Sequence, residues 1–303
     1  MVKNTNLHKA KNAKNDEFYT QLTDVAKELI HYKKHFKDKI VFCNCDDPTW
    51  SAFWKYFHLN FAELGLKKLI STHYDREEAT YKMEYTGGDD NDIDVGVKTP
   101  LEGNGDFRSQ ECLDLLDECD IVVTNPPFSL FREYVAVLME HEKKFLIIGN
   151  KNAITYKEFF PLLKDDEVWI GCTNVKEFLQ PDGSIKKFGN IGWFTNLDVA
   201  KRHEKLILWK KYTPEEYPTY DNYDAINVDK VSEIPCDYDG VMGVPITFMD
   251  KYNPIDFEII GADEAEGTGF SNGLYIQGSR YKQCYANGKR IYKRIFIRRK
   301  VGA

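Results

Sequence analysis

A short buried strand that leads directly into a proline-rich turn and a helix constrains the fold of this chain more than any other stretch. Residues 120–124 are a β-branched run typical of a buried parallel strand. Asn125-Pro126-Pro127-Phe128, here termed the tetrad, comes next, and Ser129 is a good helix N-cap before apolar residues at helical spacing. The pattern places the tetrad at the carboxyl end of a central strand, where open α/β sheets bind their ligands.

The chemistry of the tetrad suits a planar amino group. Two consecutive prolines fix φ and remove two N–H donors, so their carbonyls can only accept hydrogen bonds. Asn125 adds a side-chain carbonyl and Phe128 offers a flat ring. An amine could donate both N–H groups to the carbonyls while its heterocycle stacks on the ring. A plain proline turn at the end of a strand is the structural alternative.

Further strand and helix patterns repeat on both sides of the tetrad. Strands are predicted at residues 39–45, 67–74, 144–149, 168–171 and 191–195, and helical patterns separate several of them. These elements predict an α/β fold with a doubly wound sheet that runs to about residue 200. Beyond it the periodicity weakens, but Asn287-Gly288 predicts a type I′ hairpin.

Acidic residues follow the first two predicted strands. Asp46-Asp47-Pro48 ends the first strand without a G-x-G loop, and Asp75 ends the second, where such folds hold ribose hydroxyls. An exposed loop acid is the alternative for Asp75. Asp106 could accept an exocyclic amine and Phe107 could lie on a purine. The acidic run at residues 89–94 lacks the glycine and glutamate spacing of a calcium loop and is interpreted as a surface insertion.

Charge is distributed unevenly along the chain. The net charge is −7, yet from Gly267 onward there is no Asp or Glu among many Lys and Arg residues. The first fifteen residues likewise carry lysines and no acid. Two basic ends on an acidic body are typical of a nucleic-acid-binding protein, whereas a solubilising tail or a protected sheet edge is the alternative. The candidate nucleic-acid contacts are Lys9, Lys11, Lys14, Lys289, Arg290, Lys293 and Arg294.

Cysteine usage and hydropathy indicate the compartment. Seven cysteines without a C-x-x-C motif favour buried free thiols in a reducing environment, and no metal site is predicted. The sequence has no long apolar run and no signal peptide pattern. We therefore expect a cytoplasmic protein with no membrane contact.

With these residues in view, the chain resembles the adenine-specific DNA methyltransferases of the EcoRI modification type. The resemblance covers most of the chain, and so many long matches in one order are highly specific. They are residues 7–11, 16–21, 43–48, 105–109, 122–134, 195–198, 220–227 and 240–248.

The resemblance implies S-adenosylmethionine as cofactor on a Rossmann-like methyltransferase sheet, with a smaller mixed α/β C-terminal recognition region. Phe18, Tyr19 and Thr20 would lie near its methionine end. The other implied contacts come from the loops after the strands: Asn44, Asp46, Asp47, Pro48, Asp75, Asp106 and Phe107. The usual glycine-rich first loop is replaced here by Asp47-Pro48-Thr49-Trp50-Ser51.

The resemblance also implies that the tetrad, Asn125, Pro126, Pro127 and Phe128, acts on an adenine flipped out of duplex DNA. Acceptors from Asn125 and the Pro126 carbonyl would favour the charge-bearing nitrogen that forms as the methyl group moves. Phe128 would stack on one face of the base, and Trp193 or Phe194 on the other.

The expected organisation is a basic arm at 1–15, a catalytic domain at 16–200 and a DNA target-recognition region at 201–303. We expect a monomer that acts on double-stranded DNA in a bacterial or phage-infected cell, associated with the nucleoid. A cognate restriction endonuclease could accompany it. The alternatives are a methyltransferase for an RNA adenine or a protein glutamine, and an inactive relative that only binds DNA.

Overall fold

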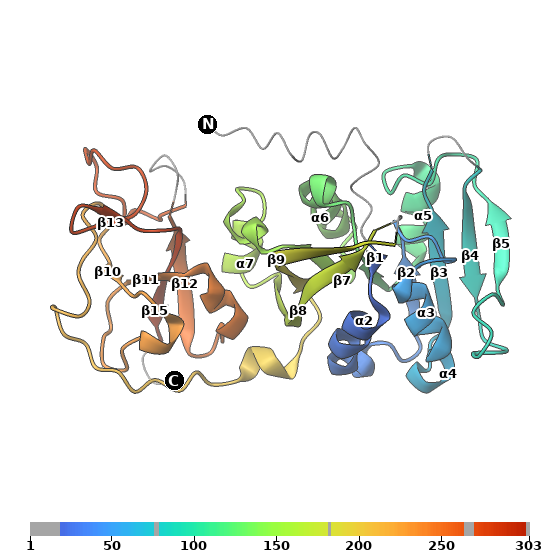
Figure 1. The fold of residues 1–303 in the computed structure, drawn as a ribbon, viewed down its shortest axis with the longest axis horizontal. Helices are drawn as coiled ribbons and strands as arrows, with labels where there is room; N and C mark the ends of the chain where they lie inside the picture. The colour runs from blue at the N-terminus through green and yellow to red at the C-terminus, as the bar shows by residue number, and fades with distance from the viewer. Residues whose placement is uncertain (1–18, 76–78, 181–182, 264–269, 301–303) are drawn as a thin grey trace. The chain divides into compact units, whose positions relative to one another are not determined.

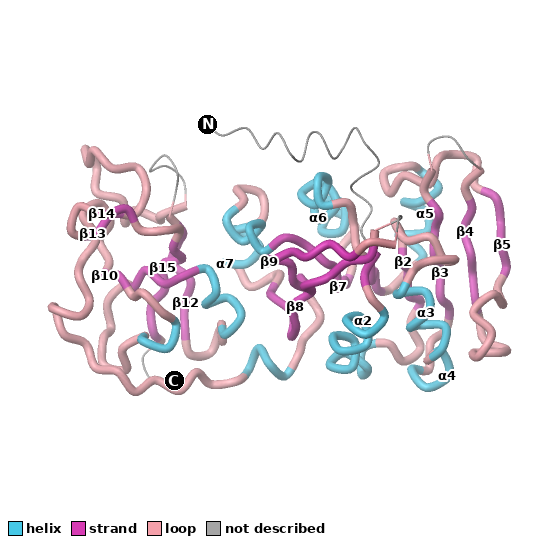
Figure 2. Tube along the Cα trace, in the orientation of Figure 1, coloured by secondary structure: helices cyan, strands magenta, loops and turns pink. Residues whose placement is uncertain are grey.

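The predicted parallel strands form the middle of one large sheet. The computed structural model describes residues 19–75, 79–180, 183–263 and 270–300 (Figures 1 and 2). Its nine-stranded sheet has the order β1-β8-β9-β7-β6-β2-β3-β4-β5. The four central strands are mutually parallel and comprise β3 (Lys68–His73), β2 (Ile40–Cys43), β6 (Ile121–Thr124) and β7 (Lys144–Asn150). The predicted α/β class and Rossmann-like sheet are confirmed.

Antiparallel strands extend the sheet at both edges. The strands β4 (Tyr81–Tyr85) and β5 (Val97–Pro100) continue from β3 and enclose the acidic insertion. On the other side β9 (Ile185–Thr195) and β8 (Trp169–Leu179) form a long hairpin, and β1 (Tyr19–Thr20) pairs with the end of β8. Both hairpin strands are 11 residues long, much longer than the short strands predicted.

Helices cover the two faces of this sheet. Figure 1 shows α2, α3 and α4 on one face and α5 and α6 on the other. Buried apolar strands lie between these layers, because every residue of β2 and β6 is buried. Fully burying one such side chain stabilises a fold by about 1.5–3 kcal/mol. The helices are α2 (Leu22–Leu29), η1 (Ile30–His35), α3 (Ala52–Leu59), α4 (Phe61–Leu64), α5 (Gln110–Glu118) and α6 (Phe131–Glu140).

Serine caps start two of the helices that follow functional loops. Ser51 Oγ accepts from the backbone N–H groups of Phe53 and Trp54, both at 3.1 Å. Ser109 Oγ accepts from Cys112 N at 3.4 Å. Ser129 was predicted to cap a helix but lies inside a 3₁₀ turn, η2 (Phe128–Leu130). Its cap role is wrong because the chain continues from this turn directly into α6, which has no side-chain cap.

A buried carboxylate joins α2 to β8. Glu28 is fully buried and accepts from Cys172 N at 2.7 Å, Thr173 N at 2.6 Å and Tyr32 Oη at 2.9 Å. Thr173 Oγ1 also donates to it, at 2.7 Å. Gly171 lies directly beneath, where an added Cβ would overlap the Glu28 carboxylate. Because its lone pairs are occupied, this acid has a structural role.

The chain divides into two compact units, which are described separately. Unit 1 comprises Met1–Ala153 with Val168–Asp198, and unit 2 comprises Ile154–Glu167 with Val199–Ala303. The large sheet belongs to unit 1. Unit 2 has a four-stranded sheet of order β10-β11-β15-β12, in which only the β10–β11 pair is parallel. Its strands are β10 (Ile226–Asn227), β11 (Met242–Pro245), β12 (Phe257–Ala262) and β15 (Arg294–Arg299).

Short helical turns complete the chain. They are η3 (Lys151–Thr155), α7 (Phe160–Lys164), η4 (Ala200–His203), η5 (Val231–Glu233) and η6 (Ile246–Lys251). In unit 2 the ring of Phe160 in α7 packs on Phe270, with centroids 5.4 Å apart. A cluster of buried side chains that includes Tyr220, Tyr223 and Phe296 forms the core of this unit.

The predicted Asn-Gly hairpin is confirmed in unit 2. It consists of β13 (Tyr285–Ala286) and β14 (Lys289–Arg290). Asn287 and Gly288 between them have φ of 53° and 70°, the positive values that a type I′ turn requires. The carboxylate of Asp221 accepts from both turn N–H groups, at 3.1 Å and 2.8 Å. Within the described part of the chain, no helix has the length and apolar character needed to span a membrane.

Candidate functional site

The tetrad and the first-strand loop meet at the carboxyl edge of the large sheet. Strands β2 and β6 are parallel neighbours, so the loops that follow them leave the sheet side by side. From this pair the strand order runs outward in opposite directions, because β3 lies on the far side of β2 and β7 lies on the far side of β6. Such a reversal of strand order opens a crevice for ligands in doubly wound sheets. The sequence prediction thus located this edge correctly.

Asp46 links the two loops. Its carboxylate accepts from Thr124 Oγ1 at 2.6 Å and from the backbone N–H of Asn125 at 3.3 Å. Its own carbonyl accepts from Ser71 Oγ in β3 at 2.6 Å. Burial raises the pKa of Asp46 to about 7, although hydrogen bonds from Thr124 and Asn125 act in the opposite direction. A cation placed beside this carboxylate would favour its ionised form.

Asn44 connects the first-strand loop to α6 and β6. It is 3% exposed, and its side-chain carbonyl accepts from Tyr134 Oη in α6. Its backbone carbonyl shares the single hydroxyl proton of Thr124 with the Asp46 carboxylate. Burial raises the pKa of Tyr134 well above its usual range, so this phenol remains a donor. Pro48 is also buried. These two of the predicted cofactor-loop residues therefore have side chains inside the fold.

Asp47 faces the other side of the loop, toward β3 and β4. One carboxylate oxygen accepts from Thr49 N at 2.9 Å and from Tyr81 Oη at 2.8 Å. The other lies 3.1 Å from Nδ1 of His73. Burial raises the pKa of Tyr81 above its usual value, so its hydroxyl keeps the proton that it donates. Asp47 therefore orders the turn that replaces a glycine-rich loop.

Asp75 and Asp106 flank the same edge. Asp75 is half-buried after β3, and its backbone N–H donates to Asn104 O at 3.2 Å. The carboxylate of Asp106 forms a two-pronged ion pair with Arg108, at 2.8 Å and 2.7 Å. Phe107, which lies between Asp106 and Arg108 in the sequence, is only 4% exposed. Its ring packs edge-on against the ring of Tyr134, with centroids 5.0 Å apart. The face that was expected to lie on a purine is thus largely covered.

The described part of the predicted methionine-end segment is Tyr19–Thr20, which forms β1 and pairs with Leu179 and Phe178 of β8. Thr20 is 7% exposed. Within the described residues its Oγ1 is buried and has no hydrogen-bond partner. A buried hydroxyl without a partner at this edge is compatible with a polar ligand. Phe18 lies outside the described residues.

The two rings described beside Phe128 come from the β8–β9 hairpin. Phe178 and Phe188 meet Phe128 edge-on, with centroids 6.0 Å and 6.2 Å away, and each other at 5.5 Å. Trp193 and Phe194, the predicted stacking partners of the base, are both 0% exposed. Their rings pack in the core against Phe53 and Phe131, so neither offers a face to a base in this structure. Phe188 is half-buried. It was not predicted as a site residue, because its contact with Phe128 depends on the register of the hairpin.

The candidate DNA contacts of unit 2 differ in exposure. Lys289 and Arg290 are exposed in β14, and Lys293 is half-buried with Nζ 3.0 Å from Thr155 Oγ1. Arg294 is only 7% exposed; its guanidinium donates to Asn227 Oδ1 at 3.3 Å and to Tyr292 O at 3.0 Å. Its assignment as a DNA contact is not supported, because it begins the central strand β15 and bonds inside the fold. Lys9, Lys11 and Lys14 lie outside the described residues.

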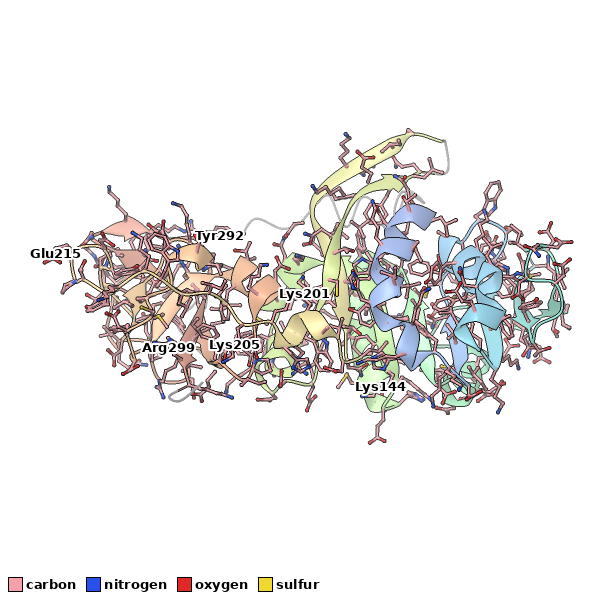
Figure 3. The ribbon with its side chains drawn as sticks, turned by 90° about the horizontal axis from the view of Figure 1, so that it is seen from below. Lys144, Lys201, Lys205, Glu215, Tyr292 and Arg299 are labelled. Atoms are coloured by element: carbon pink, nitrogen blue, oxygen red, sulfur yellow. The ribbon has the colours of Figure 1, made fainter. Side chains whose placement is uncertain are left out.

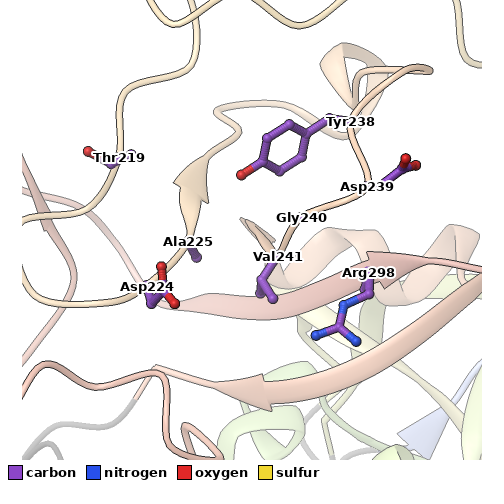
Figure 4. A pocket seen from close by; sticks show the side chains of 8 residues that line it. All are labelled: Thr219, Asp224, Ala225, Tyr238, Asp239, Gly240, Val241 and Arg298. Atoms are coloured by element: carbon purple, nitrogen blue, oxygen red, sulfur yellow. The ribbon is translucent and has the colours of Figure 1, made fainter.

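Unit 2 also contains a polar hollow of about 450 Å³ (Figure 4). Its walls include Thr219, Asp224, Tyr238, Asp239, Gly240 and Arg298. Tyr238 packs directly over Gly240, where an added Cβ would come within 2.6 Å of the ring. The part of the chain that the structure describes contains no group of His, Cys, Asp and Glu side chains suited to a metal ion.

Comparison with known proteins agrees with the resemblance noted from the sequence. The profile of the family described as "Adenine-specific methyltransferase EcoRI" matches residues 6–300. The chain is 46% identical to Type II methyltransferase M.EcoRI of Escherichia coli, covering 97% of this chain and 96% of that protein. It is 38% identical to Type II methyltransferase M.MpnI of Mycoplasma pneumoniae, covering 97% and 98%. No solved structure matches significantly. The chain therefore belongs to the EcoRI family of adenine-specific methyltransferases.

Proposed function

We propose that this protein transfers a methyl group from S-adenosylmethionine to N6 of an adenine flipped out of duplex DNA, at a specific sequence. One observation carries the proposal beyond family membership. The Asp46 carboxylate accepts hydrogen bonds from Thr124 and Asn125, which brings the loop expected to hold the cofactor against the tetrad expected to hold the base. Methyl transfer needs this proximity, because donor and acceptor must approach to near-attack distance.

The residues at the sheet edge fit the cofactor. When bound, S-adenosylmethionine supplies an electrophilic methyl group on a positively charged sulfur. Thr20 offers a buried hydroxyl, and Asp46 offers a carboxylate that a nearby positive charge would keep ionised. Asp75 is our candidate for the ribose, and Asp106 for the adenine ring. Asn44, Pro48 and Phe107 act as supports, because each is buried within the fold.

The tetrad holds the target amino group in this proposal. The Pro127 carbonyl accepts from Leu130 N at 2.9 Å, which fixes the turn. The side-chain carbonyl of Asn125 and the main-chain carbonyl of Pro126 then accept the two N–H bonds of the adenine amine. As the bond to the methyl group formed and the sulfur–methyl bond broke, the nitrogen would become positively charged, preorganised acceptors would stabilise that charge, and one amine proton would then be lost to solvent. One such interaction typically accounts for about 3–4 kcal/mol of transition-state stabilisation.

Phe128 stacks on one face of the flipped base, and Phe188 replaces Trp193 and Phe194 as our candidate for a second aromatic contact, at the side of the base. The edge-on arrangement of the two rings supports this assignment, since a base on the face of Phe128 would meet Phe188 at its side. Phe178 is fully buried and holds both rings in place. Phe128 and Phe188 therefore both offer aromatic surface to a base at the tetrad.

Residues of unit 2 and of the basic arm contact DNA in this proposal. The exposed cations of β14 lie on a hairpin that Asp221 and Asn222 fix to the core of unit 2. Arg290 and Lys289 are thus presented on a rigid support, as recognition of DNA requires. Arg294 is excluded from this surface by its burial.

The decisive experiment identifies the methylated product. The protein is expressed in cells without adenine methylation, and genomic DNA is sequenced for N6-methyladenine. Purified protein is then incubated with S-adenosylmethionine carrying a deuterated methyl group and, separately, duplex DNA, RNA and protein. We expect labelled N6-methyladenine in DNA at one sequence. Label in RNA or in glutamine, or none in any substrate, would overturn the proposal.

A further inference from the structure

The outer half of the β8–β9 hairpin extends past the carboxyl edge of the sheet. Strand β9 pairs with β7 only as far as Ile191, which lies opposite Asn150 at the end of β7. Residues 185–190 therefore continue beyond that edge, on the same side as the tetrad. Figure 3 shows the hairpin, in yellow, standing out from the helices of unit 1. A macromolecular substrate at the tetrad would meet this hairpin.

The two faces of the hairpin differ in chemistry. Phe178 lies opposite Lys186 in the register, so these side chains share a face with Phe188, two residues along β9. This face meets Phe128 through its two rings. The opposite face carries the pair Glu177 and Lys187, whose ion pair measures 3.0 Å. Two adjacent lysines thus project to opposite sides, and one of them shares a face with the rings at the tetrad.

Lys186 stands at the edge of the proposed base site. Its side chain is exposed, and its Nζ lies 5.4 Å from the centroid of the Phe188 ring. An ammonium at that distance is attracted to the ring, which directs the lysine stem along a wall of the site. A flipped nucleotide carries its phosphates just outside the pocket that holds its base. A compact, flexible ammonium is well suited to bind such a phosphate.

We propose that Lys186 binds a backbone phosphate next to the target adenine and so holds the flipped nucleotide with its base on Phe128 and beside Phe188. The inference rests on the proposed function and adds a positioning residue to it. Lys186 touches the backbone and not the reacting atoms, so its loss weakens binding of the extruded nucleotide while the chemistry of the tetrad is retained.

The test compares Lys186→Ala with Lys187→Ala, which removes the same charge one residue away on the opposite face. Each protein is titrated with a short duplex that contains the mapped methylation site. A second set of duplexes replaces the phosphate on either side of the target adenine by an uncharged methylphosphonate. Fluorescence of 2-aminopurine at the target position reports base extrusion, and single-turnover kinetics report chemistry.

We expect Lys186→Ala to bind the duplex about tenfold more weakly, the effect of losing one charge-assisted hydrogen bond. The slope of log affinity against log salt concentration should fall in magnitude by about 0.9, the value for one phosphate contact. One methylphosphonate should weaken the wild type similarly and add nothing to Lys186→Ala. Lys186→Arg should restore affinity, and Lys187→Ala should resemble the wild type.

Equal effects of Lys186→Ala and Lys187→Ala would overturn the inference, and so would a methylphosphonate penalty that persists in Lys186→Ala. In that second case the lysine would only steady the Phe188 ring. These outcomes are distinct from failure of the proposed function. A wild-type protein that makes no N6-methyladenine refutes the function before any site is mapped. Once the site is mapped, the binding comparisons test Lys186 separately from the chemical step.

Discussion

The carboxylate of Asp46 lies 3.3 Å from the backbone nitrogen of Asn125 and accepts its hydrogen bond. The same oxygen accepts from Thr124 Oγ1, so one side chain joins the ends of β2 and β6. Any group bound to the first-strand loop would be held in a fixed relation to the tetrad. In our proposal this is how donor and acceptor are aligned.

The raised pKa of Asp46 predicts a pH dependence of cofactor affinity. Since burial raises this pKa to about 7, the carboxyl is largely neutral below that pH and attracts a cation weakly. Affinity for S-adenosylmethionine should increase as the pH rises through 7 and then level off. In Asp46→Asn the affinity should be lower and independent of pH over this range. Calorimetric titration of both proteins with S-adenosylmethionine at several pH values checks these expectations. If Asp46→Asn kept the pH dependence of the wild type, Asp46 would not be the group responsible.

Without cofactor, the same group should lower stability as the pH rises. A carboxyl whose pKa is raised on folding binds its proton more tightly in the folded state, so its contribution is fully present below the ordinary pKa of 3.8 and lost by about pH 7. Asp46→Asn should remove this pH-dependent contribution to the free energy of unfolding. Chemical unfolding of the cofactor-free protein at pH 5 and pH 8 measures the difference.

Arg290 and Arg294 should behave oppositely when each is changed to alanine. Arg294→Ala removes the hydrogen bonds to Tyr292 O and to Asn227 Oδ1, which keeps its bond from Tyr220 Oη, and should lower the free energy of unfolding by about 2 kcal/mol. Arg290→Ala should leave unfolding unchanged and reduce the salt slope of DNA binding by about 0.9. Thermal unfolding and DNA titration of both variants separate the effects. If both variants lost DNA affinity equally and neither changed the free energy of unfolding, the burial of Arg294 would be contradicted.

Glu28→Ala should destabilise the protein strongly. It would leave the N–H groups of Cys172 and Thr173 without their acceptor at the junction of α2 and β8. Loss of these buried interactions should cost about 3 kcal/mol or more. Lys27→Ala on the exposed face of the same helix is the matched control and should cost less than about 1 kcal/mol. Similar unfolding curves for the two variants would disprove the structural role.

Phe188→Ala should impair base extrusion without loss of fold, because Phe188 is half-buried and lies in the exposed half of β9. A stacked ring typically contributes about 1–3 kcal/mol per base, and loss of the edge contact from Phe188 should cost no more than that. We expect lower 2-aminopurine fluorescence and slower methylation, with little change in thermal unfolding. Phe188→Trp should retain most activity. Full activity of the alanine variant would remove Phe188 from the site.

The sequence predicted the parallel strands and their loops because those signals are local. The β-branched run before Asn125 and the alternation of strand and helix suffice to predict a doubly wound sheet with the tetrad at the end of a central strand. Likewise, Asn287-Gly288 determines its own turn geometry. These features depend on backbone preferences within a few residues, and sequence patterns report such preferences directly.

The neighbours of Phe128 could not be predicted in this way. Phe178 and Phe188 reach it through the register of a long antiparallel hairpin, and no local pattern specifies that register. Trp193 and Phe194 were expected to stack on the base, yet both are buried in the core. Arg294 resembled its basic neighbours, but it begins the strand of the apolar run Ile295-Phe296-Ile297, and its guanidinium bonds to Asn227 and Tyr292 inside the fold.

The most direct test of the account is the single-turnover rate of methyl transfer by Asn125→Ala, measured with saturating cofactor on a duplex that contains the mapped site. We predict a rate reduced by about 100-fold or more, with the dissociation constants for S-adenosylmethionine and DNA within a few-fold of wild type, because the lost acceptor acts on the transition state. A near-normal rate would contradict the central claim that the tetrad holds the adenine amine.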